Sequence, residues 1–234
     1  KEKAKALKKT IVLCEGEDPR VVKAAADATK EGIAKIVLLG NEEEIKKANP
    51  DADLTGVTIV NPLTSDKLAA YNARLCELRA SKGMTPDQAE KLLKDGTYFG
   101  AMMLKEGDVD GLVSGACHST ANTLRPGLQI IKTAPGVSSV SSFNLMICPP
   151  QGNQYCPDGL VVFADCGLNP TYTSEGLADC AIATANSAKA IAGIDPKVAM
   201  LSFSTKGSAK HELVDKVVEA TKLVKEADPD LCVD

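Results

Sequence analysis

The stretch that decides the fold is Thr10–Leu39, TIVLCEGEDPRVVKAAADATKEGIAKIVLL. Its β-branched start, Thr10–Cys14, predicts a buried strand, and the polar residues EGEDPR that follow predict a loop. Asp18 and Pro19 form a helix start signal, because Asp is a good N-cap and Pro fits the first helical turn. Apolar residues then recur at helical spacing until Lys35–Leu39, which predicts the next strand. This order predicts a right-handed parallel β-α-β unit.

The alternation continues along the rest of the chain. Further strands are predicted at 57–60, 111–114, 137–148, 160–166 and 198–202, and residues 231–234 look like the start of another. Further helices are predicted at 1–9, 41–48, 65–82, 85–93, 98–107, 128–132, 173–192 and 209–227. We therefore predict an α/β fold of three layers, with mostly parallel sheets and helices on both faces. The Pro- and Gly-rich segment 149–158 predicts a hairpin or linker loop, whose flanking strands can run antiparallel.

Composition narrows the class of protein. A length of 234 residues allows one large domain or two small ones, and 44% hydrophobic with 25% charged residues is typical of a globular chain. The net charge of -4, the 3% of aromatic residues and the lack of Trp argue against nucleic-acid binding. No apolar run is long enough to cross a bilayer, and the charged start KEKAKALKK resembles no signal peptide. Because the sequence begins without Met, we expect a few native residues to precede it.

The eight cysteines lie at positions 14, 76, 117, 148, 156, 166, 180 and 232. They form no C-x-x-C pair and match no common zinc spacing. Several, such as Cys14 and Cys166, lie in apolar runs. We favour buried free thiols over disulfides or a metal site, which places the protein in a reducing cytoplasm.

Ligands of open α/β sheets bind beyond the C-terminal ends of the strands. Four loops occupy such positions here, at 15–20, 115–126, 165–174 and 203–208. The second is the richest in hydrogen-bond donors, with Ser114, His118, Ser119, Thr120, Asn122, Thr123 and Arg125. Donors and an Arg ahead of a helix favour a phosphate or carboxylate site over an ordinary Ser/Thr loop with an N-cap. We do not assign His118 as a general base.

The other loops carry weaker signals. Ser204, Thr205, Lys206 and Ser208 surround Gly207, which lets the backbone approach a ligand, but an exposed Lys in a turn explains the pattern equally well. The Walker A spacing is absent. Asp165 follows an apolar strand and can either bind a ligand or bond the amides of its own loop.

Arginine is scarce, and one of the four arginines lies at a helix end. Arg79 lies near the end of the helix predicted at residues 65–82, and Lys82 and Gly83 come shortly after it. Complementing the helix dipole and binding a phosphate in a bidentate manner are both open readings of this residue.

At these residues the sequence resembles the phosphate acetyltransferase and phosphate butyryltransferase family. The resemblance covers essentially the whole chain. It rests on VSGACHSTANTLRPGLQIIKT (113–133), FADCGLNP (163–170), SFSTKGSA (202–209), ELRASKGMT (77–85) and IVLCEGEDPRV (11–21). The acetyl branch of the family fits better than the butyryl branch, through the segments LRPGLQIIKT and SFSTKGSA.

The resemblance implies two α/β domains around a cleft, similar to the isocitrate and isopropylmalate dehydrogenases. We expect the first domain at 1–140 and the second at 141–234. The implied reaction is acetyl-CoA + phosphate ⇌ acetyl phosphate + CoA. It would proceed in a ternary complex, in which a base deprotonates the CoA thiol and the thiolate attacks the acetyl carbonyl directly, so no Cys need act as nucleophile. No permanently bound cofactor or metal and a homodimer are expected.

The resemblance also implies roles for particular residues. Arg125, Ser119, Thr120 and Thr123 would neutralise phosphate, and Arg79 matches a family arginine that binds substrate or CoA. Ser114, Asp165 and the segment 204–208 would contribute further substrate contacts, the last from the second domain. Members of the family continue beyond the position of Asp234, with the proposed base Asp and a Ser-Arg pair in the later segment. We therefore expect this portion alone to show weak or no catalysis and exposed hydrophobic surface.

Two other function classes compete. The same domain occurs behind malic enzymes, where it looks like a non-catalytic acetyl-CoA sensor. An oxidoreductase of the related dehydrogenase fold would need metal-binding aspartates and a nicotinamide site, and the sequence offers neither a suitable Asp cluster nor G-x-G-x-x-G.

Overall fold

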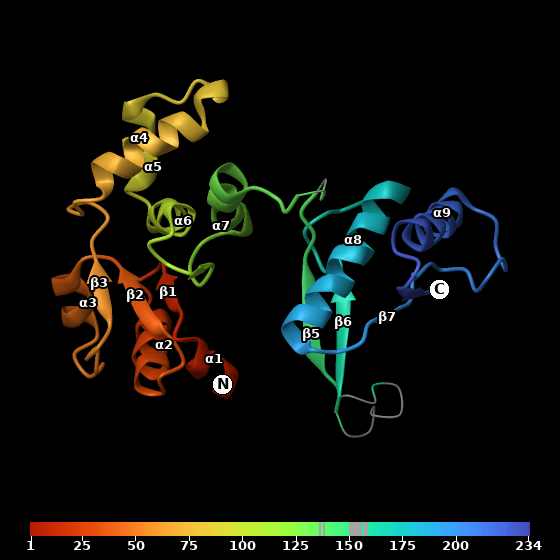
Figure 1. Cartoon of the computed structure of the whole chain (residues 1–234), viewed down its shortest axis with the longest axis horizontal. Coiled ribbons are helices and arrows are strands. Elements are labelled where there is room, and N and C mark those ends of the chain that lie inside the picture. The colour runs from red at the N-terminus through yellow and green to blue at the C-terminus, as the bar shows by residue number, and fades with distance from the viewer. Residues whose placement is uncertain (136, 138, 150–155, 157–158) are drawn as a thin grey trace. The chain divides into compact units, whose positions relative to one another are not determined.

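The computed structural model describes residues 1–135, 137, 139–149, 156 and 159–234. The chain divides into two compact units, Lys1–Lys132 and Thr133–Asp234, which Figure 1 traces in sequence order. The boundary predicted from the sequence lay at residue 140, eight residues later. Each unit is an α/β assembly, so the predicted fold class is confirmed, while the dehydrogenase-like arrangement of two domains around a cleft stays a prediction.

A parallel sheet forms the centre of the first unit, with the strand order β3-β2-β1-β4. Its members are β1 (Thr10–Leu13), β2 (Lys35–Leu39), β3 (Thr58–Val60) and β4 (Gly111–Val113). In the register of the central strand, Val12 lies opposite both Val37 and Leu112. The parallel β-α-β unit predicted for residues 10–39 is therefore confirmed. The sheet order also makes β4 a direct neighbour of β1, although about 100 residues separate them.

Helices of the first unit begin at the signals that the sequence carries. They are α1 (Glu2–Leu7), α2 (Pro19–Lys30), α3 (Glu42–Ala48), α4 (Leu68–Leu78), α5 (Pro86–Leu93), α6 (Gly96–Glu106) and α7 (Thr120–Pro126), with short turns η1 (Ala80–Lys82) and η2 (Gly127–Ile131). The Asp18 carboxylate caps α2 by accepting from the backbone N–H of Arg20. Thr85 and Gln88 form a capping box at the start of α5.

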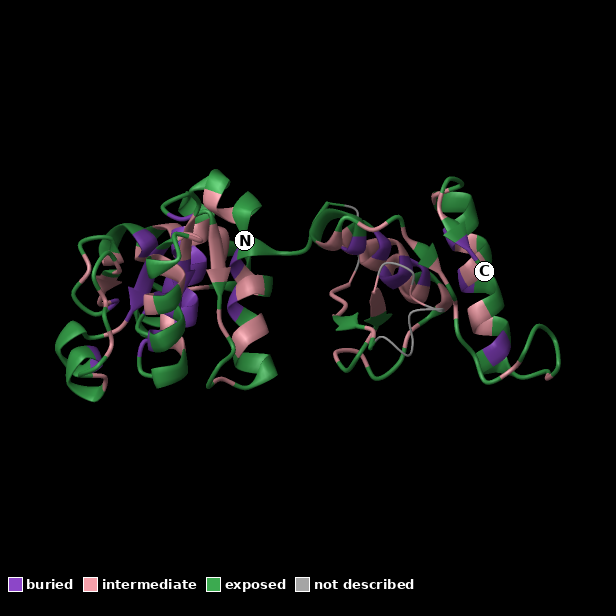
Figure 2. Ribbon diagram, turned by 90° about the horizontal axis from the view of Figure 1, so that it is seen from below, coloured by how far each residue is buried: buried purple, intermediate pink, exposed green. Residues whose placement is uncertain are grey.

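Alternate side chains of β1 enter two separate cores. Val12 and Cys14 pack with residues of α4, α5 and α6 on one face of the sheet. Leu13 packs with residues of α2 and α3 on the other face. Figure 2 shows that buried residues of this unit gather on the strands and on the inner sides of the helices. The three predicted layers are thus present, and each fully buried aliphatic side chain contributes about 1.5–3 kcal/mol of hydrophobic stabilisation.

The second unit is built from two small sheets and two long helices. Strands β5 (Phe143–Ile147) and β6 (Leu160–Ala164) pair antiparallel, and β7 (Lys197–Val198) pairs parallel with β8 (Cys232–Val233). Helix α8 (Ser174–Ser187), continued by η4 (Ala188–Ala192), packs on α9 (Glu212–Ala227) through small side chains such as Ala181 and Ala220. No helix within the described residues is long and apolar enough to cross a membrane.

Two predicted strands of this unit are shorter than expected. The strand predicted at 137–148 begins only at Phe143, because the residues before it bond to the following loop: the Val140 carbonyl accepts from Asn169 and the Ser142 hydroxyl donates to Asp165. The strand predicted at 198–202 is reduced to Lys197–Val198, since its partner β8 is only two residues long.

Two further predictions need correction in the first unit. The segment 115–126 was predicted as a loop, but its second half forms α7, because Ser119 supplies an N-cap and helical backbone runs on through Pro126. The helix predicted at 65–82 begins at Leu68 and is interrupted at Arg79, where the backbone leaves helical geometry before η1.

The preference for free thiols throughout was wrong in one place. The sulfurs of Cys148 and Cys156 are joined in a disulfide. Cys148 directly follows β5 and its N–H bonds the Gly159 carbonyl, just before β6, so hairpin pairing brings the two cysteines together. Of the segment predicted as a hairpin or linker loop, residues 150–155 and 157–158 lie outside the described residues. Among the remaining cysteines only Cys14 and Cys180 are buried.

Candidate functional site

Two of the four predicted ligand loops meet at one edge of the first sheet. Glu15 directly follows β1, and Gly115–His118 follows β4. Because β1 and β4 are parallel neighbours, their carboxyl ends lie together and the loops beyond them come into contact.

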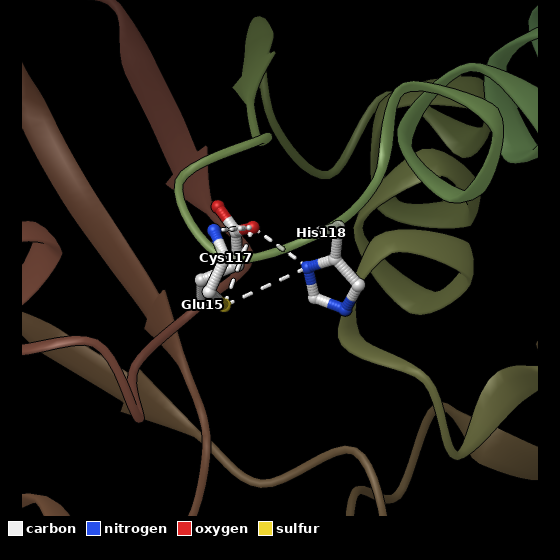
Figure 3. Close-up of side chains that lie close together, drawn as sticks. All are labelled: Glu15, Cys117 and His118. Atoms are coloured by element: carbon white, nitrogen blue, oxygen red, sulfur yellow. Dashed lines mark hydrogen bonds and ion pairs between the residues drawn. The ribbon is translucent and has the colours of Figure 1, made fainter.

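The contact is organised by the carboxylate of Glu15, which is only 1% exposed. Its Oε2 accepts from the backbone N–H groups of Gly115 and Ala116, each at 2.9 Å, and its Oε1 accepts from Cys117 N at 3.0 Å. His118 Nδ1 lies 2.6 Å from the same Oε1 (Figure 3). A buried carboxylate thus fixes four consecutive residues of a loop that is distant in sequence.

Both ionisable partners of this contact are shifted toward their charged forms. Burial disfavours the charged form of Glu15, but hydrogen bonds from His118 and from three loop amides outweigh it and lower its pKa to about 2. The hydrogen bond to Glu15 raises the pKa of His118 against the opposing effect of burial, and the charge of Asp95 adds to the rise. His118 therefore donates its Nδ1 proton to Glu15 in an ion-pair hydrogen bond.

Arg20 binds the same loop through a backbone carbonyl, whereas Glu15 binds it through backbone N–H groups. Its guanidinium bonds both carboxylate oxygens of Asp18, at 3.0 and 2.6 Å, and donates to the Ala116 carbonyl at 2.7 Å. The loop is thus bound through its amides by Glu15 and through a carbonyl by Arg20. Gly115, whose φ of 112° suits only glycine, allows the sharp turn after β4.

Cys117 and His118 present their side chains beside this cluster. The Cys117 sulfur lies 3.6 Å from Oε1 of both Glu15 and Glu17, and burial together with these carboxylates raises its pKa to about 12. Nε2 of His118 lies 3.9 Å from Oδ2 of Asp95, whose Oδ1 caps α6. Glu15, Cys117 and His118 are the group within the described residues whose ligand atoms lie close enough to hold a metal ion.

Predicted phosphate-site residues continue from this loop into α7. Ser119 caps the helix by accepting from Asn122 N, and the Thr123 hydroxyl donates to the Ser119 carbonyl at 3.1 Å. The exposed Thr120 side chain makes no hydrogen bond with a described residue. The Ser114 oxygen is shielded from solvent, beside the Cys14 thiol.

Arg125 and Arg79, the two arginines predicted to bind phosphate, both influence the pKa of Tyr98. Burial raises the pKa of Tyr98, the positive charges of Arg125 and Arg79 oppose the rise, and the negative charge of Asp95 adds to it. The Tyr98 hydroxyl donates to Gln129 at 3.0 Å. Within the described part of the chain neither arginine side chain has a hydrogen bond or an ion pair, and Nε of Arg79 is buried without a partner. Arg79 and Arg125 are thus two cations of the first unit that pair with no described carboxylate.

Asp165, in the second unit, is occupied by its own loop. Its carboxylate accepts from the backbone N–H groups of Gly167, Leu168 and Asn169 and from the side chains of Ser142, Asn169 and Tyr172. Burial disfavours its ionisation, but the bonds from Ser142 and Tyr172 and the amides lower its pKa well below the usual range. The structure shows the loop-bonding role that the sequence left open.

The segment Ser204–Ser208 is also closed on itself. The two serine hydroxyls lie 3.1 Å apart, and Ser208 Oγ accepts from Thr205 N at 3.0 Å. Lys206 is exposed and pairs with Asp234 at 2.6 Å. A cavity of about 500 Å³ in this unit is lined mostly by apolar residues of β6, α8 and 194–201, and none of the residues 204–208 lines it.

The sequence did not single out Glu15, Asp95, Tyr98 or Gln129. Glu15 stood in a predicted ligand loop, directly after a strand, and that position was its only signal. The others lie in and around helices, where only the packing of α6 against η2 shows that they border the candidate site.

Comparisons with known proteins give matches over the whole length of the chain. A family model described as phosphate acetyl/butaryl transferase matches residues 1–234. A phosphate acetyltransferase of Thermoanaerobacterium thermosaccharolyticum is 52% identical over 233 residues, which are 100% of this chain and 70% of the relative.

Solved structures of phosphotransacetylases also match the whole chain. A phosphotransacetylase from Streptococcus pyogenes superimposes with a TM-score of 0.90 at 43% identity, over 100% of this chain and 69% of that one. The EutD phosphotransacetylase from Staphylococcus aureus gives a TM-score of 0.88 at 41% identity, with the same two coverages.

Proposed function

The chain belongs to the phosphate acetyl/butaryl transferase family, and on this premise we propose that it moves an acetyl group between coenzyme A and phosphate. The reaction is acetyl-CoA + phosphate ⇌ acetyl phosphate + CoA. The acetyl branch is supported by the name phosphate acetyltransferase that relatives about half identical to this chain carry.

The observation that carries this proposal is a pair of arginines in the first unit whose side chains have no hydrogen bond or ion pair with a described residue. Arg125 and Arg79 lack partners within the described residues, so their charges are free to bind an anion. Both acetyl phosphate and CoA carry phosphate groups, and the planar fork of Arg matches two phosphate oxygens at once. We assign these two residues to substrate phosphate binding.

Hydroxyl groups near the arginines supply additional donors. Thr120, at the start of α7, has an exposed hydroxyl without a hydrogen bond to any described residue, and the Ser119 hydroxyl proton remains available while its oxygen caps the helix. Ser114 and Thr123 support this segment from its inner side. In the second unit we assign substrate contact to Lys206 and its flanking residues Ser204, Thr205 and Ser208, and we assign Asp165 to shaping its loop.

Transfer is proposed to be direct. The CoA thiolate attacks the acetyl carbonyl carbon of acetyl phosphate, the C–S bond forms, the C–O bond to phosphate breaks, and phosphate leaves with that electron pair. Positive charge beside the leaving phosphate stabilises the charge that develops there. No cysteine of this chain forms an acyl intermediate in this scheme. We also propose a homodimer.

Thioester formation from acetyl phosphate and CoA, followed by absorbance, tests the proposal. Arg125→Ala should raise KM for acetyl phosphate at least about tenfold, since one charged hydrogen bond contributes about 1.5–3 kcal/mol. Arg74→Ala is the matched control, because Arg74 pairs with Glu77 and Glu106 and should change KM less than about twofold. No thioester from the full-length wild-type protein would overturn the activity, and unchanged kinetics of Arg125→Ala in the same protein would remove that residue from the site.

A further inference from the structure

Three side chains of different ligand classes converge beyond β1 and β4, in the cluster that Figure 3 shows. We propose that Glu15, Cys117 and His118 form a binding site for Zn²⁺, with carboxylate, thiolate and imidazole ligands. This site is separate from the arginine pair and does not depend on the proposed acetyl transfer.

The distances fit a tetrahedral ion. The Cys117 sulfur lies 3.6 Å from Glu15 Oε1 and 3.8 Å from His118 Nδ1. Zinc bonds of about 2.0 Å to N and O and 2.3 Å to S require ligand atoms roughly 3.3–3.5 Å apart. Only the third separation, 2.6 Å between His118 Nδ1 and Glu15 Oε1, must open, by about 0.7 Å, when the metal replaces the hydrogen bond.

The surroundings favour a cation. Glu17 Oε1 lies 3.6 Å from the Cys117 sulfur and adds negative charge beside the site, while a water can complete the tetrahedron. A divalent ion stabilises the thiolate form of Cys117 and binds the deprotonated Nδ1 of His118. Binding therefore releases the thiol proton of Cys117 and the Nδ1 proton of His118.

A carboxylate lies beside the second ring nitrogen of His118. A ligating His usually directs its second ring nitrogen to a carboxylate, which orients the ring. His118 Nε2 lies 3.9 Å from Asp95 Oδ2, a separation that a small rotation of the ring can shorten to a hydrogen bond, and Asp95 is fixed in place because its other oxygen caps α6.

The ion can reach this site from solvent. Cys117 and Glu17 are exposed and the His118 side chain is 21% exposed, while Glu15 closes the buried side. Cys117 and His118 immediately precede Ser119, the cap of α7, so a bound ion would fix the segment that leads into that helix.

Titration with Co²⁺, a spectroscopic probe of zinc sites, tests the proposal on the whole chain. We expect one Co²⁺ per chain, with a thiolate-to-cobalt charge-transfer band and visible bands of tetrahedral cobalt, and Zn²⁺ should displace both. Cys117→Ser should abolish the charge-transfer band. Cys232→Ser, which removes an exposed thiol of the second unit, is the control and should leave the titration unchanged.

A second variant reports on orientation of the histidine. Asp95→Asn keeps the helix cap but removes the charge facing His118, and should weaken Co²⁺ binding at least about tenfold while keeping the band. The proposal is overturned if saturating Co²⁺ gives no charge-transfer band, if Cys117→Ser retains it, or if Cys232→Ser removes it.

Discussion

Glu15 and Asp165 both accept hydrogen bonds from the backbone of a loop, but the loops lie at different distances along the chain. Each follows a strand, each accepts three backbone N–H groups, and each has a lowered pKa. Asp165 binds amides two to four residues ahead of it, whereas Glu15 binds amides about 100 residues away. Asp165 therefore shapes one loop, while Glu15 joins two loops through the neighbouring strands β1 and β4. The partners differ too, because Glu15 alone bonds a group, His118, whose charge changes near neutral pH.

The largest expected effect is that of Glu15→Ala. Removing this buried carboxylate leaves three amides and His118 without their acceptor, and we expect the first unit to lose about 3–5 kcal/mol of its free energy of unfolding. Denaturant unfolding measures the loss, and hydrogen exchange of residues 115–118 should accelerate. Glu17→Ala, at an exposed neighbour, should stay within about 0.5 kcal/mol of wild type. Equal stability of the two variants would contradict the claim that the Glu15 carboxylate holds the loops after β1 and β4 together.

A smaller effect is expected for Asp165→Ala. This carboxylate is partly exposed, so water can replace some of its bonds, and we expect a loss of roughly 2–3 kcal/mol in the second unit. Faster hydrogen exchange should be confined to residues 166–172 and the segment around Ser142. Asp195→Ala, an exposed aspartate of the same unit, is the control. Acceleration that extended through α8 and α9 would show that Asp165 supports the whole unit and not one loop.

The smallest expected effect is a dependence of stability on pH, and it distinguishes Glu15, which pairs with a histidine, from Asp165, which does not. The pKa of His118 is raised in the folded state, so its bond to Glu15 contributes stability that is complete below its ordinary pKa of 6.5 and is lost as pH rises through the folded value. His118→Gln should therefore cost about 1 kcal/mol near pH 5.5 and less near pH 9.

The carboxylates themselves show the opposite dependence. Glu15 contributes stability that is present above about 4.5 and is lost as pH falls toward about 2, and Asp165 behaves likewise below its own ordinary value. A cost of His118→Gln that is the same near pH 5.5 and pH 9 would show that the imidazole acts only by its shape.

Local signals allowed much of the first unit to be predicted. Asp18 before Pro19 and Thr85 before Pro86 gave helix starts that the structure reproduces within a residue, because N-caps act through bonds only two or three residues long. Polar and glycine-rich segments after strands marked the loops that hold Glu15 and Gly115–His118.

Errors arose where partners distant in sequence compete with local preference. Ser142 bonds Asp165 and the strand starts late, and Cys148 meets Cys156 because β5 and β6 pair. The spacing of the cysteines did not predict the candidate zinc site for the same reason. Its third ligand, Glu15, is about 100 residues from Cys117 and His118.

By itself, the sequence determined the alternation of strands and helices, the caps and the family resemblance, because hydrophobic period and hydrogen bonds to near neighbours act over a few residues. Only the tertiary structure decided that β4 lies beside β1, which brings the Glu15 carboxylate into contact with the loop of His118. Strand order depends on how residues from distant parts of the chain pack on both faces of the sheet. It therefore cannot be predicted from any short stretch of this sequence.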